Sequence, residues 1–379
     1  MKIGIDARFW GPTKTGIGRY VFELVTHLER IDKENEYVIF LQKEDFENVE
    51  FESPRFKKVL ADFPIYSLSE QIKFPLVLRR ERLDLLHVPH FNAPVFYLGD
   101  FVVTIHDLIK HKFKSRSTTT RNPIRFWLSQ FVYYLVFSSA INRSKKIITP
   151  SAWVKKEVQI KFHQDDKKIV VTYEAPAENL KKIAQLNWSS QKVASVLKNY
   201  RLAKPYLLYV GNLYPHKNID KLIEALEQIP SAKLVIVTAR NVFLKKAKKR
   251  FGEYKAFNRV KFLGFIPDAD LPAIYKGAEV FVFPSLSEGF GLPGIEAMAF
   301  GTPVAAADNT ALPEVYDEAA IYFDPNDSDD IAQRINQVLT DKDLAESLSS
   351  RGQAWARTFS WTKTARATLD IYNESRASS

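Results

Sequence analysis

The chain has 379 residues, enough for two or three domains, and its hydrophobic content of 46% is ordinary for a globular protein. It contains no cysteine, which excludes disulfides and cysteine-bound zinc or iron–sulfur clusters. The net charge of +10, concentrated between residues 101 and 250, leaves nucleic acid, anionic lipid and phosphorylated substrates open as partners, beside a simple solvated basic face.

Strand-like and helical runs alternate along the chain, a pattern typical of α/β proteins with parallel sheets. Each expected strand is an apolar run rich in β-branched or aromatic residues. In the first half, strands are expected at residues 2–5, 37–41, 83–88, 101–105, 146–149 and 169–172. In the second half they are expected at residues 206–210, 234–237, 260–263, 280–283, 304–306 and 321–323.

A polar stretch without a strand signal, residues 177–201, separates these two sets and is the expected linker. It divides the chain into a first domain, residues 1–180, and a second, residues 200–357. A last helix is expected at residues 361–373, after a loop around residues 358–360.

Nothing in the sequence predicts a membrane crossing. Residues 1–6 indicate a short apolar strand and not a signal peptide. The most apolar predicted helix, residues 126–141, is shorter than a bilayer span and is interrupted by serines, so we interpret it as a core or interfacial helix. Basic residues just before it are expected to face an anionic membrane together with Phe113, Phe126 and Trp127; they are Lys110, Lys112, Lys114, Arg116, Arg121 and Arg125.

Two glycines, Gly16 and Gly18, follow the first strand and open a helix expected at residues 19–28. Such a turn suits the phosphate-binding loop of a dinucleotide fold. Val21 stands where the third glycine of that motif belongs, which argues against a nicotinamide cofactor. Arg19 either meets an anion at this turn or is a solvated arginine at the start of the helix.

Three histidines lie at the ends of two expected strands: His87 and His90 at the end of one, and His106 at the end of the other. Ligands of open α/β sheets bind at the carboxyl ends of strands, so two strands that deliver histidine to that edge indicate a site. A metal site is conceivable but no ligand spacing supports it, and a satisfied polar core residue is the other interpretation.

A glycine-rich loop with two carboxylates, residues 284–299, lies between a buried strand and a helix. Pro293 suits the first turn of that helix, and the free N–H groups at a helix N-terminus bind anions. Glycines at 289, 291 and 294 are expected to let a ligand approach the backbone. Glu288 and Glu296 cannot bind phosphate but accept hydrogen bonds from hydroxyls. The loop therefore predicts a sugar nucleotide, unless these acids only stabilise the helix macrodipole.

The run E-G-F-G-L-P-G-I-E-A-M-A, followed by G-T-P-V, resembles the signature of the large family of retaining glycosyltransferases of the GT-B fold, in which two glutamates are separated by seven residues, as Glu288 and Glu296 are here. The resemblance extends over residues 261–325. It implies two Rossmann-like domains facing across a cleft, with the C-terminal helix, residues 358–379, returning to the first domain. It also implies that the first domain binds the acceptor and the second the donor.

The resemblance assigns roles to residues at matching positions. The expected catalytic residues are His106, Lys217 and Glu288, with His106 beside the donor sugar. The expected donor-binding residues are Gly16, Gly18, Gly211, Asn212, Lys217, Phe265, Glu288, Gly289, Phe290, Gly291, Leu292 and Glu296. The expected acceptor contacts are Arg19, His90 and Asn92. Asn212 departs from the family pattern, which has arginine there, so one phosphate contact is lost or becomes a neutral hydrogen bond.

Asp268 and Asp270 match the metal-binding D-x-D of the other glycosyltransferase fold. They precede a short helix expected at residues 271–278, and we interpret them as capping residues instead. No metal site and no cofactor are therefore expected, and Lys217 with a helix N-terminus would stabilise the departing diphosphate.

The function implied by the resemblance is transfer of a sugar, with retention, from a nucleoside diphosphate sugar to a hydroxyl of a glycan or a lipid-linked glycan. GDP-mannose is the expected donor, with UDP-glucose and UDP-N-acetylglucosamine as alternatives. A non-catalytic nucleotide-sugar-binding protein, a sugar-nucleotide epimerase and a phosphorylase remain as rivals. A cytoplasmic protein, peripheral at the inner face of the membrane and without nucleic-acid partners, is expected.

Overall fold

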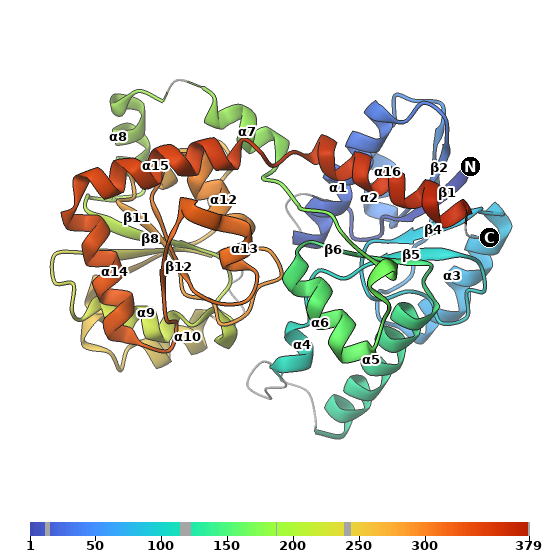
Figure 1. Ribbon diagram of the computed structural model, residues 1–379, viewed down its shortest axis with the longest axis horizontal. Helices are drawn as coiled ribbons and strands as arrows, with labels where there is room; N and C mark the ends of the chain where they lie inside the picture. Colours follow the sequence, from blue (N-terminus) through green and yellow to red (C-terminus); the bar gives the residue numbers. More distant parts are fainter. Residues whose placement is uncertain (12–15, 114–122, 187, 239–243, 378–379) are drawn as a thin grey trace. The chain divides into compact units, whose positions relative to one another are not determined.

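The computed structural model describes residues 1–11, 16–113, 123–186, 188–238 and 244–377. The chain forms two compact units, each a parallel sheet with helices on both faces (Figure 1). Unit 1 comprises Met1–Glu174 and Ser360–Ser379, and unit 2 comprises Ala175–Phe359.

The sheet of unit 1 has seven parallel strands in the order β3-β2-β1-β4-β5-β6-β7. The strands are β1 (Lys2–Asp6), β2 (Glu36–Leu41), β3 (Phe56–Leu60), β4 (Leu85–Val88), β5 (Phe101–Thr104), β6 (Lys146–Thr149) and β7 (Ile169–Val171). The strand order reverses between β1 and β4, and this switch point is where open α/β sheets bind ligands.

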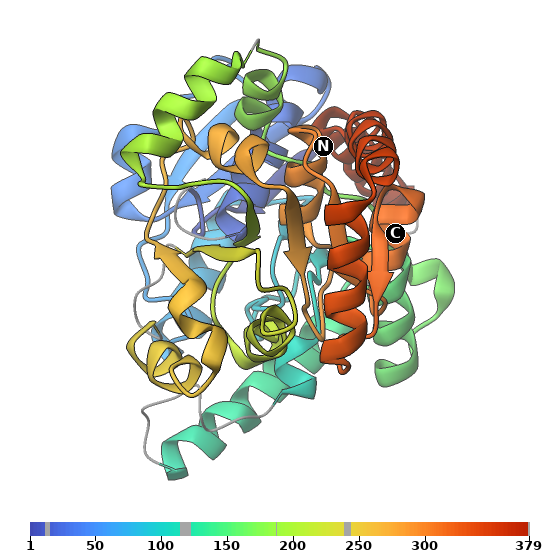
Figure 2. The same cartoon turned by 90° about the vertical axis from the view of Figure 1, so that its left-hand side faces the viewer.

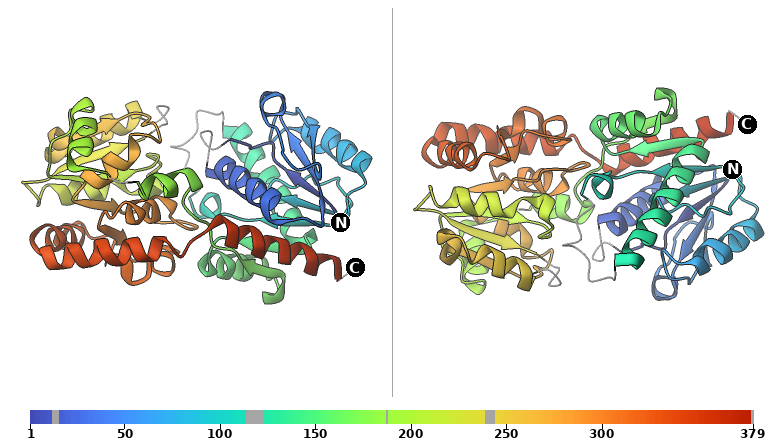
Figure 3. Two further views of the ribbon diagram at one scale, coloured as in Figure 1. Left: turned by 90° about the horizontal axis from the view of Figure 1, so that it is seen from above. Right: turned by 90° about the horizontal axis from the view of Figure 1, so that it is seen from below.

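The helices of unit 1 cover both faces of this sheet. They are α1 (Gly16–Ile31), α2 (Lys43–Asn48), α3 (Leu68–Glu81), α4 (Ile109–Lys112), α5 (Pro123–Arg143), α6 (Ala152–Phe162) and α16 (Trp361–Ala377). A buried apolar cluster joins α3, α5 and α6 to the sheet through residues such as Phe74, Phe137 and Val158. Helix α16 packs along α1 (Figure 3), so the C-terminal segment completes unit 1.

The sheet of unit 2 repeats this topology with six parallel strands in the order β10-β9-β8-β11-β12-β13. The strands are β8 (Tyr206–Val210), β9 (Lys233–Val237), β10 (Val260–Leu263), β11 (Val280–Phe283), β12 (Val304–Ala307) and β13 (Ile321–Phe323). Its switch point lies between β8 and β11.

The helices of unit 2 are α7 (Glu178–Ala184), α8 (Ser190–Asn199), α9 (Ile219–Leu226), α10 (Leu244–Phe251), α11 (Leu271–Gly277), α12 (Leu292–Ala299), α13 (Leu312–Tyr316), α14 (Ser328–Thr340) and α15 (Lys342–Ala356). Helices α9 and α10 lie on the opposite side of the sheet from α11 and α12 (Figure 2).

Every strand expected from the sequence is present, and one further strand, β3, was not expected. Its sequence, FKKVL, places two lysines in the middle of the strand and so breaks the apolar run. Lysine suits this position because β3 is at the edge of the sheet, where charged side chains block further pairing.

The expected linker does not separate the two units. Residues 177–201 contain α7 and α8, which belong to unit 2 because Leu180 and Leu197 are buried and both helices contact α11. The boundary of unit 1 therefore falls at Glu174 instead of residue 180. Within the described ranges, no helix combines the length and apolarity that a bilayer span requires.

Candidate functional site

The loop after β11 and the loop after β8 meet at the switch point of unit 2. Glu288 lies in the first loop, and Lys217 ends a short 3₁₀ turn, Pro215–Lys217, in the second. The Nζ atom of Lys217 is 2.5 Å from Oε1 of Glu288, and both side chains are largely buried. The backbone N–H of Leu286 also donates to the carbonyl of His216, at 2.7 Å, so the two loops are joined by backbone as well as by charge.

Helix α12 begins directly after this glycine-rich loop, with Gly291 at the N-cap and Pro293 in the first turn. Gly291 has φ of 99°, a conformation that glycine adopts without strain. A Cβ atom on Gly291 or Gly294 would lie within 2.6 Å of the Tyr316 hydroxyl. The absence of a side chain at these two glycines therefore makes room for Tyr316.

The second glutamate of the motif, Glu296, lies on α12 and is mostly buried. Its Oε2 atom accepts a hydrogen bond of 3.1 Å from the hydroxyl of Tyr275 on α11. Tyr275 was not predicted as a site residue, because a buried tyrosine in an apolar helix has no signal in the sequence that separates it from a core residue. The hydrogen bond fixes one carboxylate oxygen in place.

The remaining donor residues predicted in unit 2 surround these loops. Gly211 follows β8 with φ of 155°, and Oδ1 of Asn212 accepts a bond of 3.3 Å from the N–H of Tyr214, so Asn212 shapes its own loop. Phe265 is 61% exposed. Gly289 and Phe290 are buried, and Leu292 is half-buried at the start of α12.

His216, which precedes Lys217, is a site residue that the sequence analysis missed. Burial and the neighbouring charge of Lys217 lower the pKa of His216 to about 4, against an opposing effect of Glu288. The imidazole is therefore neutral near pH 7. The neutral state of His216 depends on its burial and on the charges beside it. The sequence alone does not show that Glu288, 72 positions later in the chain, lies near His216.

Asp268 and Asp270 do not cap α11, which corrects the interpretation made from the sequence. Asp270 occupies the N-cap position without a side-chain capping bond, because its Oδ2 atom accepts from the Tyr200 hydroxyl at 2.7 Å. Asp268 accepts from the side-chain amide of Asn179 at 2.8 Å. Both carboxylates therefore join α11 to the segment of α7 and α8.

In unit 1, His106 follows β5 and is held from both sides. Its Nδ1 atom is 2.9 Å from Oε1 of Glu174, and its Nε2 atom is 3.0 Å from the carbonyl oxygen of Pro89. A carbonyl only accepts, so Nε2 donates, and a carboxylate partner favours a proton on Nδ1 as well. Burial opposes the charge, but the hydrogen bond and charge of Glu174 outweigh it and raise the pKa of His106.

His87 and His90 have different surroundings from His106. His87 is fully buried on β4, with Nδ1 2.6 Å from the hydroxyl of Tyr372 and Nε2 2.8 Å from Oγ1 of Thr104. Burial, together with the charge of His106, lowers the pKa of His87 to about 3, so it is a satisfied core residue. His90 is buried beside Tyr66, with 3.4 Å between Nε2 and the hydroxyl. In the described part of the chain, no group of three or more histidine or acidic residues is arranged to hold a metal ion.

A buried charged cluster lies beside His90 at the carboxyl end of β1. The guanidinium of Arg8 forms bonds of 2.6–2.8 Å with the carboxylates of Asp6 and Glu70. Glu70 also accepts from the side-chain amide of Asn92 at 2.7 Å. The side-chain amide of Asn92 therefore ties the segment after β4 to Glu70 on α3, and Asn92 lies next to His90.

The predicted glycine turn of unit 1 lies at the start of α1. Gly16 is exposed, with open space where a Cβ atom would stand, and Gly18 is buried. Arg19 is half-buried on the same turn. Residues 12–15, which precede this turn, lie outside the described residues.

Comparisons with known proteins match both units of the chain to glycosyltransferase families. The family model "Glycosyl transferases group 1" matches residues 197–355, and "Glycosyltransferase Family 4" matches residues 14–175. The O-antigen chain mannosyltransferase B of Escherichia coli is 30% identical over 94% of this chain and 96% of its own.

Two solved structures have the same fold. Sucrose-phosphate synthase from Thermosynechococcus elongatus superposes with a TM-score of 0.78 at 22% identity, and covers 100% of both chains. Anabaena HepE, in complex with UDP and glucose, superposes with a TM-score of 0.75 at 19% identity, over 99% of this chain and 100% of its own. The predicted architecture of two parallel-sheet α/β domains of the GT-B type is confirmed.

Proposed function

Because this chain belongs to the glycosyl transferases group 1 family and is a nucleotide-sugar glycosyltransferase, we propose that it transfers mannose with retention of configuration from GDP-mannose to a hydroxyl of a glycan or lipid-linked glycan. Unit 2 would bind the donor and unit 1 the acceptor. The observation that carries this proposal is the Lys217–Glu288 pair at the switch point of unit 2, with Glu296 on the helix that begins there.

Binding of the donor would use the existing groups at the start of α12. The ammonium of Lys217 would meet the diphosphate, since lysine acts on phosphate as a compact point charge. The N–H groups at the first turn of α12 would add hydrogen bonds. Glu296, with one oxygen fixed by Tyr275, would accept hydrogen bonds from the ribose hydroxyls, and Glu288 would accept them from the sugar.

The chemical step would be departure of the nucleoside diphosphate from the anomeric carbon while the acceptor hydroxyl attacks. Charge grows on the leaving diphosphate, so Lys217 and the helix N-terminus would act most strongly in the transition state. The leaving phosphate would take the proton of the acceptor hydroxyl. His106, held by Glu174 and by the carbonyl of Pro89, would supply positive charge at the carboxyl edge of the unit 1 sheet. We propose that no metal ion is needed.

The sugar is assigned from the relatives. The E. coli relative, which matches nearly the whole chain, is a mannosyltransferase of the O-antigen chain. The Anabaena neighbour binds UDP and glucose, so UDP-glucose remains the second candidate donor. A single carboxylate that meets a ribose does not distinguish GDP from UDP, and a panel of donors is therefore required.

Contact with an anionic membrane is proposed through unit 1, but not through all the basic residues first expected. The ammonium of Lys110 lies 5.3–5.5 Å from three ring centroids, including that of Phe91, and Lys112 forms an ion pair of 2.6 Å with Glu157. Both are therefore engaged within the fold. Lys114, Arg116 and Arg121, and the side chains of Arg125 and Phe126, lie outside the described residues.

A more favourable surface for such contact lies on helices α3 and α5. Both join strands in the same direction across the sheet, so both lie on the same face of it. Arg143 at the end of α5 donates to the carbonyl of Val95, which ties the 95–98 loop to α5. Large exposed apolar side chains gather on these three segments, and we name them the α3–α5 face: Leu68, Ile72, Leu76, Phe96, Leu98, Trp127, Phe131, Val132 and Leu135. Exposed apolar surface of this extent marks a protein or membrane contact.

The rival functions differ in what they release. A nucleotide-sugar-binding protein releases no nucleoside diphosphate, and an epimerase releases it without an acceptor or changes the sugar. A glycosyltransferase releases it at a rate that rises with acceptor. Measuring nucleoside diphosphate release for GDP-mannose, UDP-glucose and UDP-N-acetylglucosamine, with and without a mannose-containing acceptor, separates these cases. Release that does not respond to any acceptor would overturn the proposal.

A further inference from the structure

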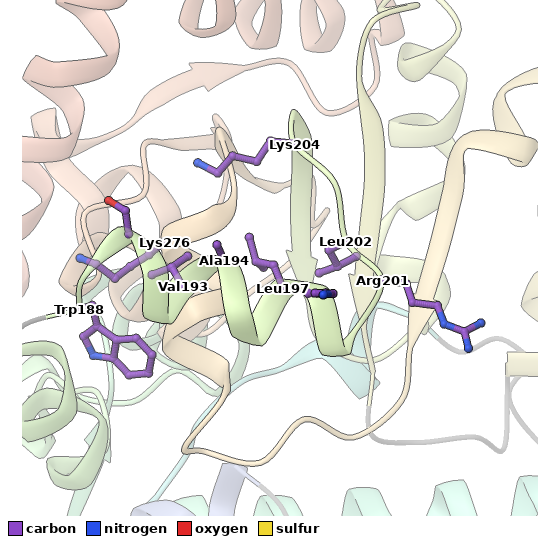
Figure 4. Close-up of a pocket in the computed structure, with 10 residues that line it drawn as sticks. Trp188, Val193, Ala194, Leu197, Arg201, Leu202, Lys204 and Lys276 are labelled. Carbon is purple, nitrogen blue, oxygen red and sulfur yellow. The ribbon is translucent and has the colours of Figure 1, made fainter.

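A second candidate binding site lies in unit 2, in an open cavity of about 720 Å³ between α8, α11 and the segment before β8. Its lining combines apolar and basic side chains: Trp188, Ser190, Val193, Ala194, Leu197, Lys198, Arg201, Leu202, Lys204 and Lys276. Figure 4 shows Trp188 and Lys276 at one end, Arg201 at the other, and Leu197 and Leu202 between them. The volume is in the range of about 300–1,000 Å³ that is usual for small-molecule sites.

The charges of this cavity are of one sign. Its lining contains four basic side chains and no acidic one. Lys204 has an exposed partner, Glu279, at 3.6 Å. Among the described residues, no carboxylate lies within ion-pair distance of Lys198 or Arg201. Cations gathered without compensating carboxylates repel one another, and an anionic ligand would relieve that repulsion.

The apolar part of the cavity is held in a fixed shape. The indole N–H of Trp188 donates to the carbonyl of Ile183 at 3.0 Å, and the ammonium of Lys192 lies 4.2 Å from the indole ring centroid. Leu197 is buried against α11, where a Cβ atom on Gly277 would come within 2.8 Å of it. This wall therefore keeps its form without a ligand, as pre-formed small-molecule sites do.

From this combination we propose that the cavity binds an amphipathic phosphate ester, with its apolar chain along Val193, Leu197 and Leu202 and its phosphate against Lys198 and Arg201. Inorganic phosphate alone would leave the apolar wall in water, and a neutral chain would leave the cations without an anion. The site is separate from the donor loops, although α11 carries both Lys276 and the Tyr275 that donates to Glu296.

The test uses the full-length protein and farnesyl phosphate, below its aggregation limit, in titration calorimetry. Saturable binding at one site is expected, at least tenfold tighter than binding of farnesol or of inorganic phosphate. A double variant, Lys198→Gln with Arg201→Gln, should weaken it at least tenfold. The matched control, Lys342→Gln with Arg357→Gln, removes the same charges from exposed positions elsewhere in unit 2 and should leave it unchanged.

Three results would overturn the proposal. Equal binding of farnesol would show that the cations have no role. Equal weakening by both double variants would reduce the effect to net charge. Loss of farnesyl phosphate binding in saturating GDP and UDP, with no effect of the Lys198 and Arg201 substitutions, would place the probe in the donor site. Thermal unfolding of each variant, expected to match that of the wild type, verifies that the protein is folded.

Discussion

The ammonium of Lys217 lies 2.5 Å from a carboxylate oxygen of Glu288, and the two residues come from loops that follow β8 and β11, neighbouring strands at the switch point of unit 2. Neither side chain has another charged partner within ion-pair distance among the described residues. Without the donor, each therefore neutralises the other. With the donor, Lys217 would turn to phosphate and Glu288 to a sugar hydroxyl.

Replacing Lys217 should therefore affect both stability and donor binding. Lys217→Met leaves the mostly buried Glu288 carboxylate without its cation, which is expected to lower the free energy of unfolding by about 3–5 kcal/mol. The exposed pair of Lys221 and Glu224, 3.0 Å apart, supplies the control, since Lys221→Met should cost only about 0–1 kcal/mol. Urea unfolding measures both. Equal effects of the two substitutions would contradict a buried pair at the site.

Substitution of Glu296 should mainly affect donor affinity, and substitution of His106 should mainly affect turnover. Glu296→Gln removes a charged acceptor of ribose hydroxyls and should weaken donor binding by about 1–3 kcal/mol. His106→Ala should lower kcat and leave donor affinity nearly unchanged, because Lys217, Glu288 and Glu296, the side chains proposed to hold the donor, lie in unit 2 and His106 lies in unit 1. Calorimetry with the donor and steady-state kinetics measure the two effects, and Glu318→Gln, an exposed acid of unit 2, is the control. Weaker donor binding in His106→Ala, together with a lower kcat and unchanged donor affinity in Glu296→Gln, would contradict these assignments.

The folded-state pKa of His106 is raised, and this gives a pH dependence with a definite sign. The raised pKa contributes stability that is fully present below the ordinary histidine pKa of about 6.5 and is lost as the pH rises through the folded-state pKa. Glu174→Gln should lower the pKa of His106 and remove this contribution. Following the imidazole by NMR through a pH titration measures it. An unchanged His106 pKa in the variant would exclude Glu174 as its cause.

His87 supplies an internal control, because its pKa is shifted in the opposite direction from that of His106. Its pKa is lowered to about 3, so the folded protein keeps it neutral while the unfolded chain takes up a proton below about pH 6.5. The stability that it contributes is therefore lost as the pH falls from 6.5 towards 3. In the same NMR titration, the ring of His87 should not titrate above pH 4.

The α3–α5 face should bind anionic vesicles. Phe131 and Leu135 are 61% and 54% exposed on successive turns of α5, so Phe131→Ser with Leu135→Ser should abolish binding with little loss of stability. Co-sedimentation with vesicles of phosphatidylglycerol, compared with phosphatidylcholine, measures it. The control, Ile160→Ser, removes an exposed apolar side chain of α6 outside this face. Wild-type protein that does not sediment with either vesicle at low salt would leave the α3–α5 face without a membrane role.

Much of the architecture could be predicted because buried parallel strands are continuous apolar runs, as in Val280–Phe283. The glycine-rich loop and its two glutamates could be located from the glycine pattern and from the spacing of Glu288 and Glu296. What could not be predicted depends on partners distant in the chain. Tyr316 fills the space beside Gly294, and Glu174 lies 68 residues from the histidine that it holds. Asp270 satisfies the sequence rule for a helix cap, yet its side chain bonds to Tyr200, 70 residues away.

The stereochemistry of the product tests the central claim most directly. Wild-type protein would be incubated with GDP-mannose and a mannose-containing acceptor in excess chelator, and the new anomeric centre followed by proton NMR. The account predicts an α-mannoside, the configuration of the donor, formed together with GDP by the wild type and at a greatly reduced rate by Lys217→Met. A β-mannoside would contradict retention, and transfer that stops with chelator and returns with manganese would contradict a metal-free site.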